Sequence, residues 1–221
     1  MPIISVLNPK GGSGKTTLST NLARSLHERG FSVLIVDTDP QGSARDWHAV
    51  NEKNPLPLVA MDRPETLKSL SRIAASYDYT IVDGAAKLED LSAAALVNSD
   101  AVLIPVQPSP YDIWAMSDLV EKIKVRQTIT EGKPRAAFIV SRAIQNSKLS
   151  GEVGAALDDC GLARFKTFIV QRQIYPQSAA EGLSVFDTTH AQALAEINSL
   201  TDETIQLLSG GFEHGIISKT A

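Results

Sequence analysis

The sequence predicts an α/β fold, in which a mainly parallel, twisted sheet is covered by helices on both faces. Two observations predict it. Apolar strand-like runs alternate with helix-like runs along the whole chain, and hydrophobic residues make up 43% of it, which is ample for a core on each side of a sheet. A chain of 221 residues without a linker or repeat suits one domain, residues 1–221. In such folds ligands bind at the carboxyl ends of the strands.

The expected strands are short apolar runs. In chain order they are Ile3–Leu7, Ser32–Asp37, Pro57–Met61, Thr80–Asp83, Ala101–Val106, Ala136–Val140 and Phe165–Val170. The expected helices lie between these runs, and the first keeps its apolar residues at helical spacing and stops at Gly30, a residue type that ends helices readily. The helices are expected near Lys15–Arg29, Pro64–Ser76, Leu88–Asn98, Asp112–Thr130, Ser150–Asp159 and His190–Leu208.

A glycine-rich turn follows the first expected strand and opens the first expected helix. Backbone N–H groups in such a turn point inward and, together with the helix dipole, form a cradle for anions. Lys15 would reach the β- and γ-phosphates of a nucleotide, and the Thr16 hydroxyl would ligate Mg²⁺. Pro9 stands where the usual loop has its first glycine, and Lys10 adds a second lysine. The residues expected to contact the phosphates are Gly11, Gly12, Ser13, Gly14, Lys15, Thr16 and Thr17.

This K-G-G-x-G-K-[ST] form resembles the ParA/MinD family of ATPases with a deviant Walker A loop. The chain looks most like the small ParA-type partition ATPases without an N-terminal helix-turn-helix region, because it begins at the first strand. The resemblance implies ATP and Mg²⁺ as ligands and a homodimer formed on ATP binding. In that dimer the lysine matched by Lys10 crosses to the partner's nucleotide. A cation supplied in this way stabilises charge in the transition state and is worth about 10³–10⁵ in rate.

Acidic residues end two of the expected strands. Asp37 and Asp39 lie two positions apart, so in an extended chain their carboxylates point the same way. The resembled family carries the same D-x-D-P-Q-G signature, in which the acid matched by Asp39 positions the attacking water and the one matched by Asp37 supports the Mg²⁺ shell. Asp83 reads as a Walker B acid that holds the water shell of Mg²⁺. Catalysis would then rest on Lys10, Lys15 and Asp39.

The switch loop after Asp83 departs from the family pattern. The family usually continues with Thr-Pro-Pro or Gly-Pro-Pro, whereas residues 84–86 here read Gly-Ala-Ala. Proline fixes the backbone angle φ, so this loop lacks that stiffening. The sequence therefore leaves the geometry of the loop open.

Two further segments follow strands and have two readings each. Residues 107–111 carry two prolines, and by resemblance they lie at the dimer interface with Asp112 near the partner's nucleotide; alternatively Asp112 is the N-cap of a plain connector. Arg142 follows another strand, where many family members touch adenine with an Asn-Arg pair, but Ser141 replaces the asparagine. Arg142 could equally be a surface arginine. Residues 174–176 are a second candidate for the wall of the base site.

Composition limits the partners and the compartment. The formal net charge is −4, so nonspecific DNA binding needs a local basic patch, for which Arg164, Lys166 and Arg172 are candidates. A solvated surface is the alternative for each of them. Cys160 is the single cysteine, which excludes an internal disulfide and a thiolate-held cluster within this chain. No apolar run is long enough to span a bilayer and no signal peptide is evident, so we expect a cytoplasmic, nucleoid-associated protein without membrane attachment.

The leading functional hypothesis is an ATP hydrolase that drives plasmid or chromosome partition together with a ParB-like adaptor. The same ATPase core could instead position a protein cargo, such as a carboxysome or a chemotaxis array. A third hypothesis is a metabolic phosphoryl-transfer enzyme on the same fold, as in dethiobiotin synthetase, which would not need Lys10. The sequence does not name the cargo.

Overall fold

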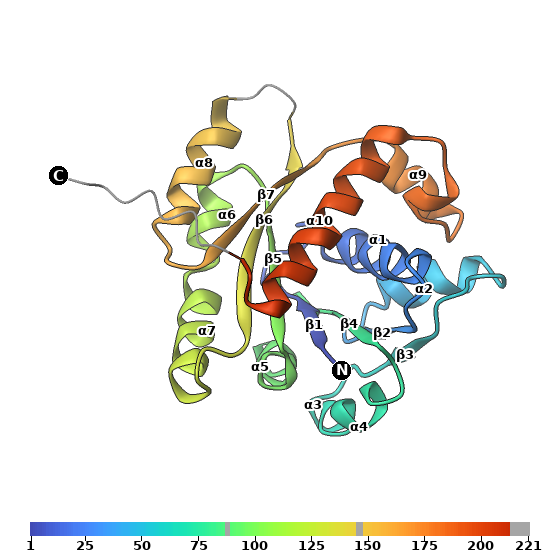
Figure 1. The fold of residues 1–221 in the computed structure, drawn as a ribbon, viewed down its shortest axis with the longest axis horizontal. Helices are drawn as coiled ribbons and strands as arrows, with labels where there is room; N and C mark the ends of the chain where they lie inside the picture. The colour runs from blue at the N-terminus through green and yellow to red at the C-terminus, as the bar shows by residue number, and fades with distance from the viewer. Residues whose placement is uncertain (87–88, 145–147, 213–221) are drawn as a thin grey trace.

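A computed structural model describes residues 1–86, 89–144 and 148–212. Within these residues, parallel strands form a sheet in the order β3-β2-β4-β1-β5-β6-β7 (Figure 1). The α/β fold with a parallel sheet is therefore confirmed. The strands are β1 (Ile3–Val6), β2 (Val33–Asp37), β3 (Leu58–Ala60), β4 (Tyr79–Asp83), β5 (Ala101–Val106), β6 (Arg135–Ala143) and β7 (Ala163–Val170).

Helices cover both faces of the sheet, because each central strand is apolar on both sides. Along β1, Ile3 packs into the core on one face, whereas Ile4 and Val6 pack into the core on the other. The face with Ile4 carries α1 (Lys15–Glu28), α2 (Ser43–Val50), α9 (Ile174–Ala180), the 3₁₀ turn η1 (Val185–Asp187) and α10 (Ala191–Ser209). The face with Ile3 carries α3 (Pro64–Leu67), α4 (Leu70–Ala74), α5 (Glu89–Asn98), α6 (Pro110–Trp114), α7 (Ser117–Ile129) and α8 (Lys148–Asp158).

The strand register brings the motif-bearing strand ends together. β1 lies between β4 and β5, so the loop that leaves β1 emerges in the middle of the sheet. Val6, the last residue of β1, pairs with Asp83, and Asp37 pairs with the same residue from the other side. Three strands thus end in one row at the carboxyl edge, and the expected phosphate loop and both strand-end acids share that edge.

Two of the expected helices are each divided in two. Residues 64–76 form α3 and α4, and the break between them carries Ser69, whose hydroxyl donates to the Thr66 carbonyl at 2.8 Å. Residues 112–130 belong to α6 and α7, and there Ser117 donates to the Trp114 carbonyl at 2.5 Å. Serine hydroxyls of this kind compete with the helix for backbone groups. The prediction of single long helices was therefore wrong.

Other differences concern element boundaries and omissions. The expected helix start at Leu88 lies outside the described residues, and α5 is described from Glu89. Two further helices, α2 and α9, are only eight and seven residues long and were not predicted from the sequence. Among the described residues, no helix combines the length and the apolar character that crossing a membrane requires.

Candidate active site

The loop between β1 and α1 is shaped as an anion cradle. Gly12 and Gly14 have φ values of 76° and 96°, a left-handed conformation that favours glycine. A Cβ added at Gly11 or Gly12 would meet nothing within 4 Å, so the space beside these two glycines is open. The Ser13 hydroxyl is buried and has no hydrogen-bond partner among the described residues, which leaves it available to a ligand.

Lys15 lies across this open loop. Its ammonium group donates to the Lys10 carbonyl at 3.1 Å. Burial lowers the pKa of Lys15, while the carboxylates of Asp83 and Asp39 act in the opposite direction. A buried cation with an incomplete set of partners is electrostatically suited to an incoming phosphate.

Asn8 holds the start of the loop in place. Its side-chain amide donates to the Pro105 carbonyl at the end of β5, and its side-chain oxygen accepts from the Lys10 backbone N–H, both at 2.6 Å. Asn8 is buried, and its contact with Pro105 is shielded from water. Asn8 was not among the predicted site residues, although a polar side chain between an apolar strand and the glycine-rich turn was a visible signal.

Asp83 faces the first turn of α1. Its two carboxylate oxygens accept hydrogen bonds from Thr16 at 2.7 Å and from Ser19 at 2.9 Å. Burial raises the pKa of Asp83 to about 7, and the two hydroxyl donors oppose this shift. A hydroxyl and a carboxylate are the hard oxygen ligands that Mg²⁺ prefers, so this donor set fits the expected cation. Ser19 is a second residue that sequence reasoning missed, because its partner lies on another strand.

Asp37 is engaged with the chain that follows it. One oxygen accepts from the Asp39 backbone N–H at 2.9 Å, and the other accepts from the Arg45 backbone N–H at 3.0 Å. The Arg45 guanidinium lies 3.4 Å from the same carboxylate. Burial is the main influence on Asp37 and raises its pKa, although these donors lower it. Asp37 therefore anchors the start of α2, and its role in a Mg²⁺ shell stays a prediction.

Asp39 is more accessible than Asp37. Its side chain is half-buried and accepts from the Gln41 backbone N–H at 3.0 Å. Its carbonyl is held by the Arg45 guanidinium at 2.6 Å. The two acids of the D-x-D-P-Q-G signature thus differ, since Asp37 is fully buried and Asp39 is half-buried at the carboxyl edge of the sheet.

Lys10 forms an ion pair with Asp112 of the same chain. The Asp112 side chain is 2% exposed and the Lys10 side chain 43% exposed. The N-cap position of α6 is occupied by Ser109, so the alternative reading of Asp112 as the N-cap was wrong. The structure instead brings the second lysine of the loop to an acid that lies 102 residues away in sequence.

A cavity of about 540 Å³ adjoins the loop beside Gly14 and Thr17. Arg142, Tyr175 and Pro176 line it, so the predicted base-site segments do meet the phosphate loop. Arg142 is exposed and has a φ of 51°. The other lining residues come mainly from the ends of β6 and β7 and from α9.

Ser141 lines this cavity and hydrogen-bonds to the phosphate loop. Its hydroxyl donates to the Ser13 carbonyl at 2.7 Å, and the residue is 2% exposed. The side chain is therefore committed to the phosphate loop. On the other wall, Glu196 of α10 accepts from the Tyr175 hydroxyl at 3.2 Å and pairs with Arg172 at 2.5 Å, which ties α9 and the end of β7 to α10.

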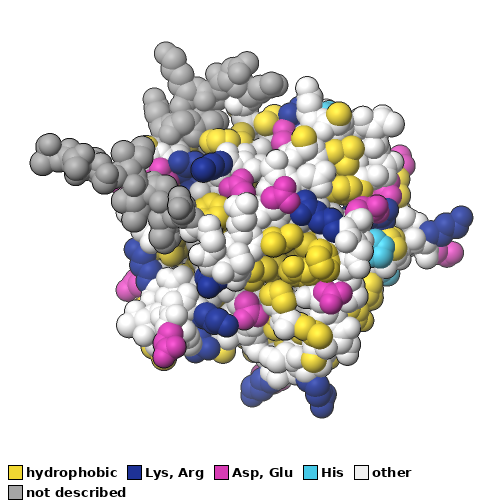
Figure 2. Space-filling model, in the orientation of Figure 1, with side chains coloured by type: hydrophobic (Ala, Val, Ile, Leu, Met, Phe, Trp, Pro, Cys, Tyr) yellow, Lys and Arg dark blue, Asp and Glu magenta, His cyan; other side chains and the backbone are white. Residues whose placement is uncertain are grey.

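The three basic residues proposed for DNA contact lie beside acids. Arg164 donates to both oxygens of Asp158, at 2.8 and 3.0 Å, and Arg172 is paired with Glu196. The backbone N–H of Lys166 donates to Glu203 at 2.7 Å. Figure 2 shows basic and acidic side chains interleaved on the face in view. Any attraction for DNA at Arg164 and Arg172 is therefore reduced by a neighbouring carboxylate.

The chain matches the CobQ/CobB/MinD/ParA nucleotide binding domain family over residues 4–185. It is 31% identical to Maintenance of carboxysome distribution protein A of Halothiobacillus neapolitanus over 91% of this chain and 95% of that protein. It is 28% identical to Protein ParA of Rhizobium radiobacter over 79% of this chain and 81% of that one.

A solved structure of cobyrinic acid a,c-diamide synthase from Mycobacterium smegmatis, with a bound ATP analogue and magnesium, is similar in fold. Its TM-score is 0.78 at 18% identity, and the likeness covers 97% of this chain and 98% of that one. A glycine-rich loop after the central strand, strand-end acids at the same edge of a parallel sheet and a match over most of the length agree with one another. The chain belongs to the CobQ/CobB/MinD/ParA family of nucleotide-binding domains.

Proposed function

We propose that this protein is an ATPase that binds ATP and Mg²⁺, dimerises on binding them and hydrolyses ATP to cycle between two assembly states. One observation carries this proposal. The phosphate loop holds two lysines with different surroundings, since Lys15 lies buried across the cradle and Lys10 lies half-exposed at its rim. One lysine suffices to bind a triphosphate, whereas a second one at the rim is suited to reach a neighbouring subunit.

Different residues of the chain have separate roles in ATP hydrolysis. Gly11, Gly12 and Gly14 let backbone N–H groups approach the phosphates, and Lys15 balances their charge. Thr16 and Asp83 would hold Mg²⁺, which supplies charge neutralisation at the phosphates. The half-buried Asp39 carboxylate orients the attacking water.

Lys10 of the second copy completes the site. Its ammonium group stabilises the charge that develops on the transferring phosphoryl group, and such cations contribute about 10³–10⁵ in rate. Hydrolysis then depends on dimer concentration, which is the property that a positioning switch needs. Arg142, Tyr175 and Pro176 form the wall against which the base lies.

Two cargoes are compatible with this switch. In the first, the ATP-bound dimer binds DNA nonspecifically at the nucleoid and a ParB-like adaptor triggers hydrolysis, which drives plasmid or chromosome partition. In the second, the same core positions a protein cargo such as a carboxysome. The second candidate is favoured by the match to a carboxysome distribution protein, because it covers 91% of this chain at 31% identity.

The central test uses Lys10→Ala, with Lys53→Ala as a control at an exposed lysine outside the site. We expect Lys10→Ala to keep the ATP affinity of the wild type and to lose the rise of specific ATPase activity with protein concentration. Nucleotide binding is measured by fluorescence titration and turnover by phosphate release. Unchanged concentration dependence in Lys10→Ala would refute the role of Lys10 in a second subunit.

DNA binding tests whether either cargo is moved along the nucleoid. Binding of unspecific duplex DNA is measured with ATP and with ADP at two salt concentrations, because phosphate contacts weaken steeply with salt. ATP-dependent, salt-sensitive binding that Lys166→Glu weakens and Lys53→Glu leaves unchanged would support a mechanism that uses the nucleoid as its track, with either cargo. Absence of ATP-dependent binding would exclude that mechanism for both cargoes.

A further inference from the structure

The two side chains of the ion pair between Lys10 and Asp112 differ in their exposure to solvent. Asp112 is fixed in α6 with its side chain 2% exposed, whereas the Lys10 side chain is 43% exposed. The lysine is therefore the movable partner and the acid the stationary one. While the Lys10 side chain is paired with Asp112 of its own subunit, it cannot reach the nucleotide of a second subunit.

Asp112 also has an unused oxygen. Its Oδ2 atom is buried and has no hydrogen-bond partner among the described residues, so Lys10 is the charged group that compensates this carboxylate. Buried charge without compensation is costly. Moving Lys10 away consequently carries an energetic penalty that dimerisation has to overcome.

The backbone of Lys10 is held on both sides, independently of its side chain. Its N–H donates to Asn8 at 2.6 Å and its carbonyl accepts from Lys15 at 3.1 Å. Only the side chain is thus free to change partners.

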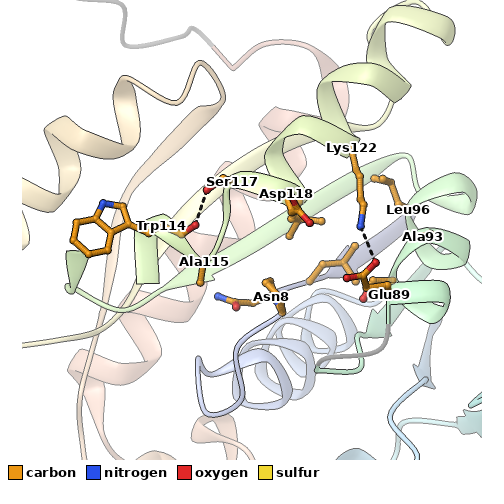
Figure 3. Close-up of a pocket in the computed structure, with 13 residues that line it drawn as sticks. Asn8, Glu89, Ala93, Leu96, Trp114, Ala115, Ser117, Asp118 and Lys122 are labelled. Carbon is orange, nitrogen blue, oxygen red and sulfur yellow. Dashed lines mark hydrogen bonds and ion pairs between the residues drawn. The ribbon is translucent and has the colours of Figure 1, made fainter. Parts of the chain in front are cut away.

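Two exposed aromatic side chains and a groove lie beside the segment that carries Asp112. Tyr111 and Trp114 flank it on α6, are 72% and 68% exposed, and stack edge to face with ring centroids 5.5 Å apart. A groove of about 260 Å³, lined by Asn8 and Pro9 on the loop side, separates the loop from Trp114 and the start of α7 (Figure 3). An exposed aromatic pair beside an open groove can shift without disturbing a packed core.

We propose that Asp112 is a positioning residue that holds Lys10 within its own subunit until an ATP-bound second copy of this chain arrives. The inference rests on the proposed function, because it takes Lys10 as the group that acts on the partner's nucleotide. Asp112 then sets how readily the dimer forms. Since both copies must release their lysine, a pair that is open one-tenth of the time weakens dimerisation by about a hundredfold.

The test measures the dissociation constant of the dimer by analytical ultracentrifugation with a non-hydrolysable ATP analogue and Mg²⁺. Asp112→Asn should lower this constant by about tenfold or more, and Asp112→Glu, which can keep the pair, should stay near the wild type. Asp118→Asn is the matched control, because Asp118 is an exposed acid of the next helix and does not contact Lys10. Thermal unfolding of each variant shows that it is folded.

A double-mutant cycle separates this inference from the function on which it rests. In a Lys10→Gln background, Asp112→Asn should have no effect on dimerisation, because no lysine remains to be released. The inference is overturned if Asp112→Asn weakens the dimer, changes it no more than Asp118→Asn does, or tightens it equally without Lys10. If Lys10→Gln alone keeps wild-type stimulated turnover, the proposed function fails instead.

Discussion

The phosphate end and the base end of the nucleotide site are built in opposite ways. At the phosphate end, one uninterrupted stretch from Lys10 to Thr17 supplies the cradle, and the side chains of Lys15 and Thr16 make specific polar contacts. At the base end, a cavity of about 540 Å³ is assembled from residues of β6, β7 and α9, and its most distinctive wall residue, Arg142, is exposed. Affinity for the phosphates therefore comes from residues that are contiguous in the sequence, whereas base recognition depends on how elements distant in the sequence pack.

The largest expected effect is at the phosphate end, where Asp83→Asn should stabilise the nucleotide-free protein at pH 8. A folded-state pKa of about 7 lies above the usual value of 3.8, so the folded state binds more protons than the unfolded state between these values. Wild-type stability therefore falls as pH rises from about 4 to about 7 and levels off above. At about 1.4 kcal/mol per pKa unit, the gain at pH 8 is up to about 4 kcal/mol.

Thermal unfolding of wild type and Asp83→Asn at pH 5 and pH 8, without metal or nucleotide, measures this gain. The stabilisation should be larger at pH 8 than at pH 5, and Mg²⁺ should no longer strengthen nucleotide binding in the variant. A gain that does not depend on pH, or a loss of stability at pH 8, would show that burial does not govern this carboxylate.

Lys15→Ala should abolish most of the ATP affinity. The side chain supplies a charge-assisted hydrogen bond to phosphate, worth about 1.5–3 kcal/mol, so the dissociation constant should rise by roughly ten- to a hundredfold. Isothermal titration with ATP and Mg²⁺ measures it. Lys10→Ala is the matched control at the other lysine of the loop and should keep wild-type affinity. Equal losses in both variants would mean that the two lysines do not have separate roles.

The sequence predicted which segments border the nucleotide site, but it did not predict the contacts between distant residues that hold those segments in place. The loop, Asp37 and Asp83 are recognisable because each motif is contiguous with the strand that presents it. The contact of Asn8 with Pro105 and that of Lys10 with Asp112 join residues about a hundred positions apart, so no local pattern reveals them. α9 is similarly hidden, since a seven-residue helix contains only two turns of periodicity.

A smaller effect is expected at the junction of the two ends. Ser141→Ala removes the hydroxyl that donates to the Ser13 carbonyl and leaves a buried acceptor without it, which should cost about 1–2 kcal/mol of stability. The ratio of ATP to GTP affinity should stay unchanged, because the hydroxyl is committed to the loop. Denaturant unfolding and competition binding measure the two quantities. A changed base preference with normal stability would assign Ser141 to the base instead.

The smallest effect concerns Arg142 at the base end. Substitution by glycine and by alanine removes the same side chain, but the two replacements differ in how readily they adopt a positive φ. The φ of 51° is unfavourable for a residue with a Cβ, so Arg142→Gly should be more stable than Arg142→Ala by about 1 kcal/mol. Both should weaken ATP binding equally, and only by a few-fold, because an exposed wall residue adds little to an affinity set by the phosphates. Unfolding and titration of the pair separate backbone conformation from side-chain contact. If the alanine variant bound ATP as tightly as the wild type, Arg142 would be a surface arginine, and base recognition would rest on the wall formed by Tyr175 and Pro176.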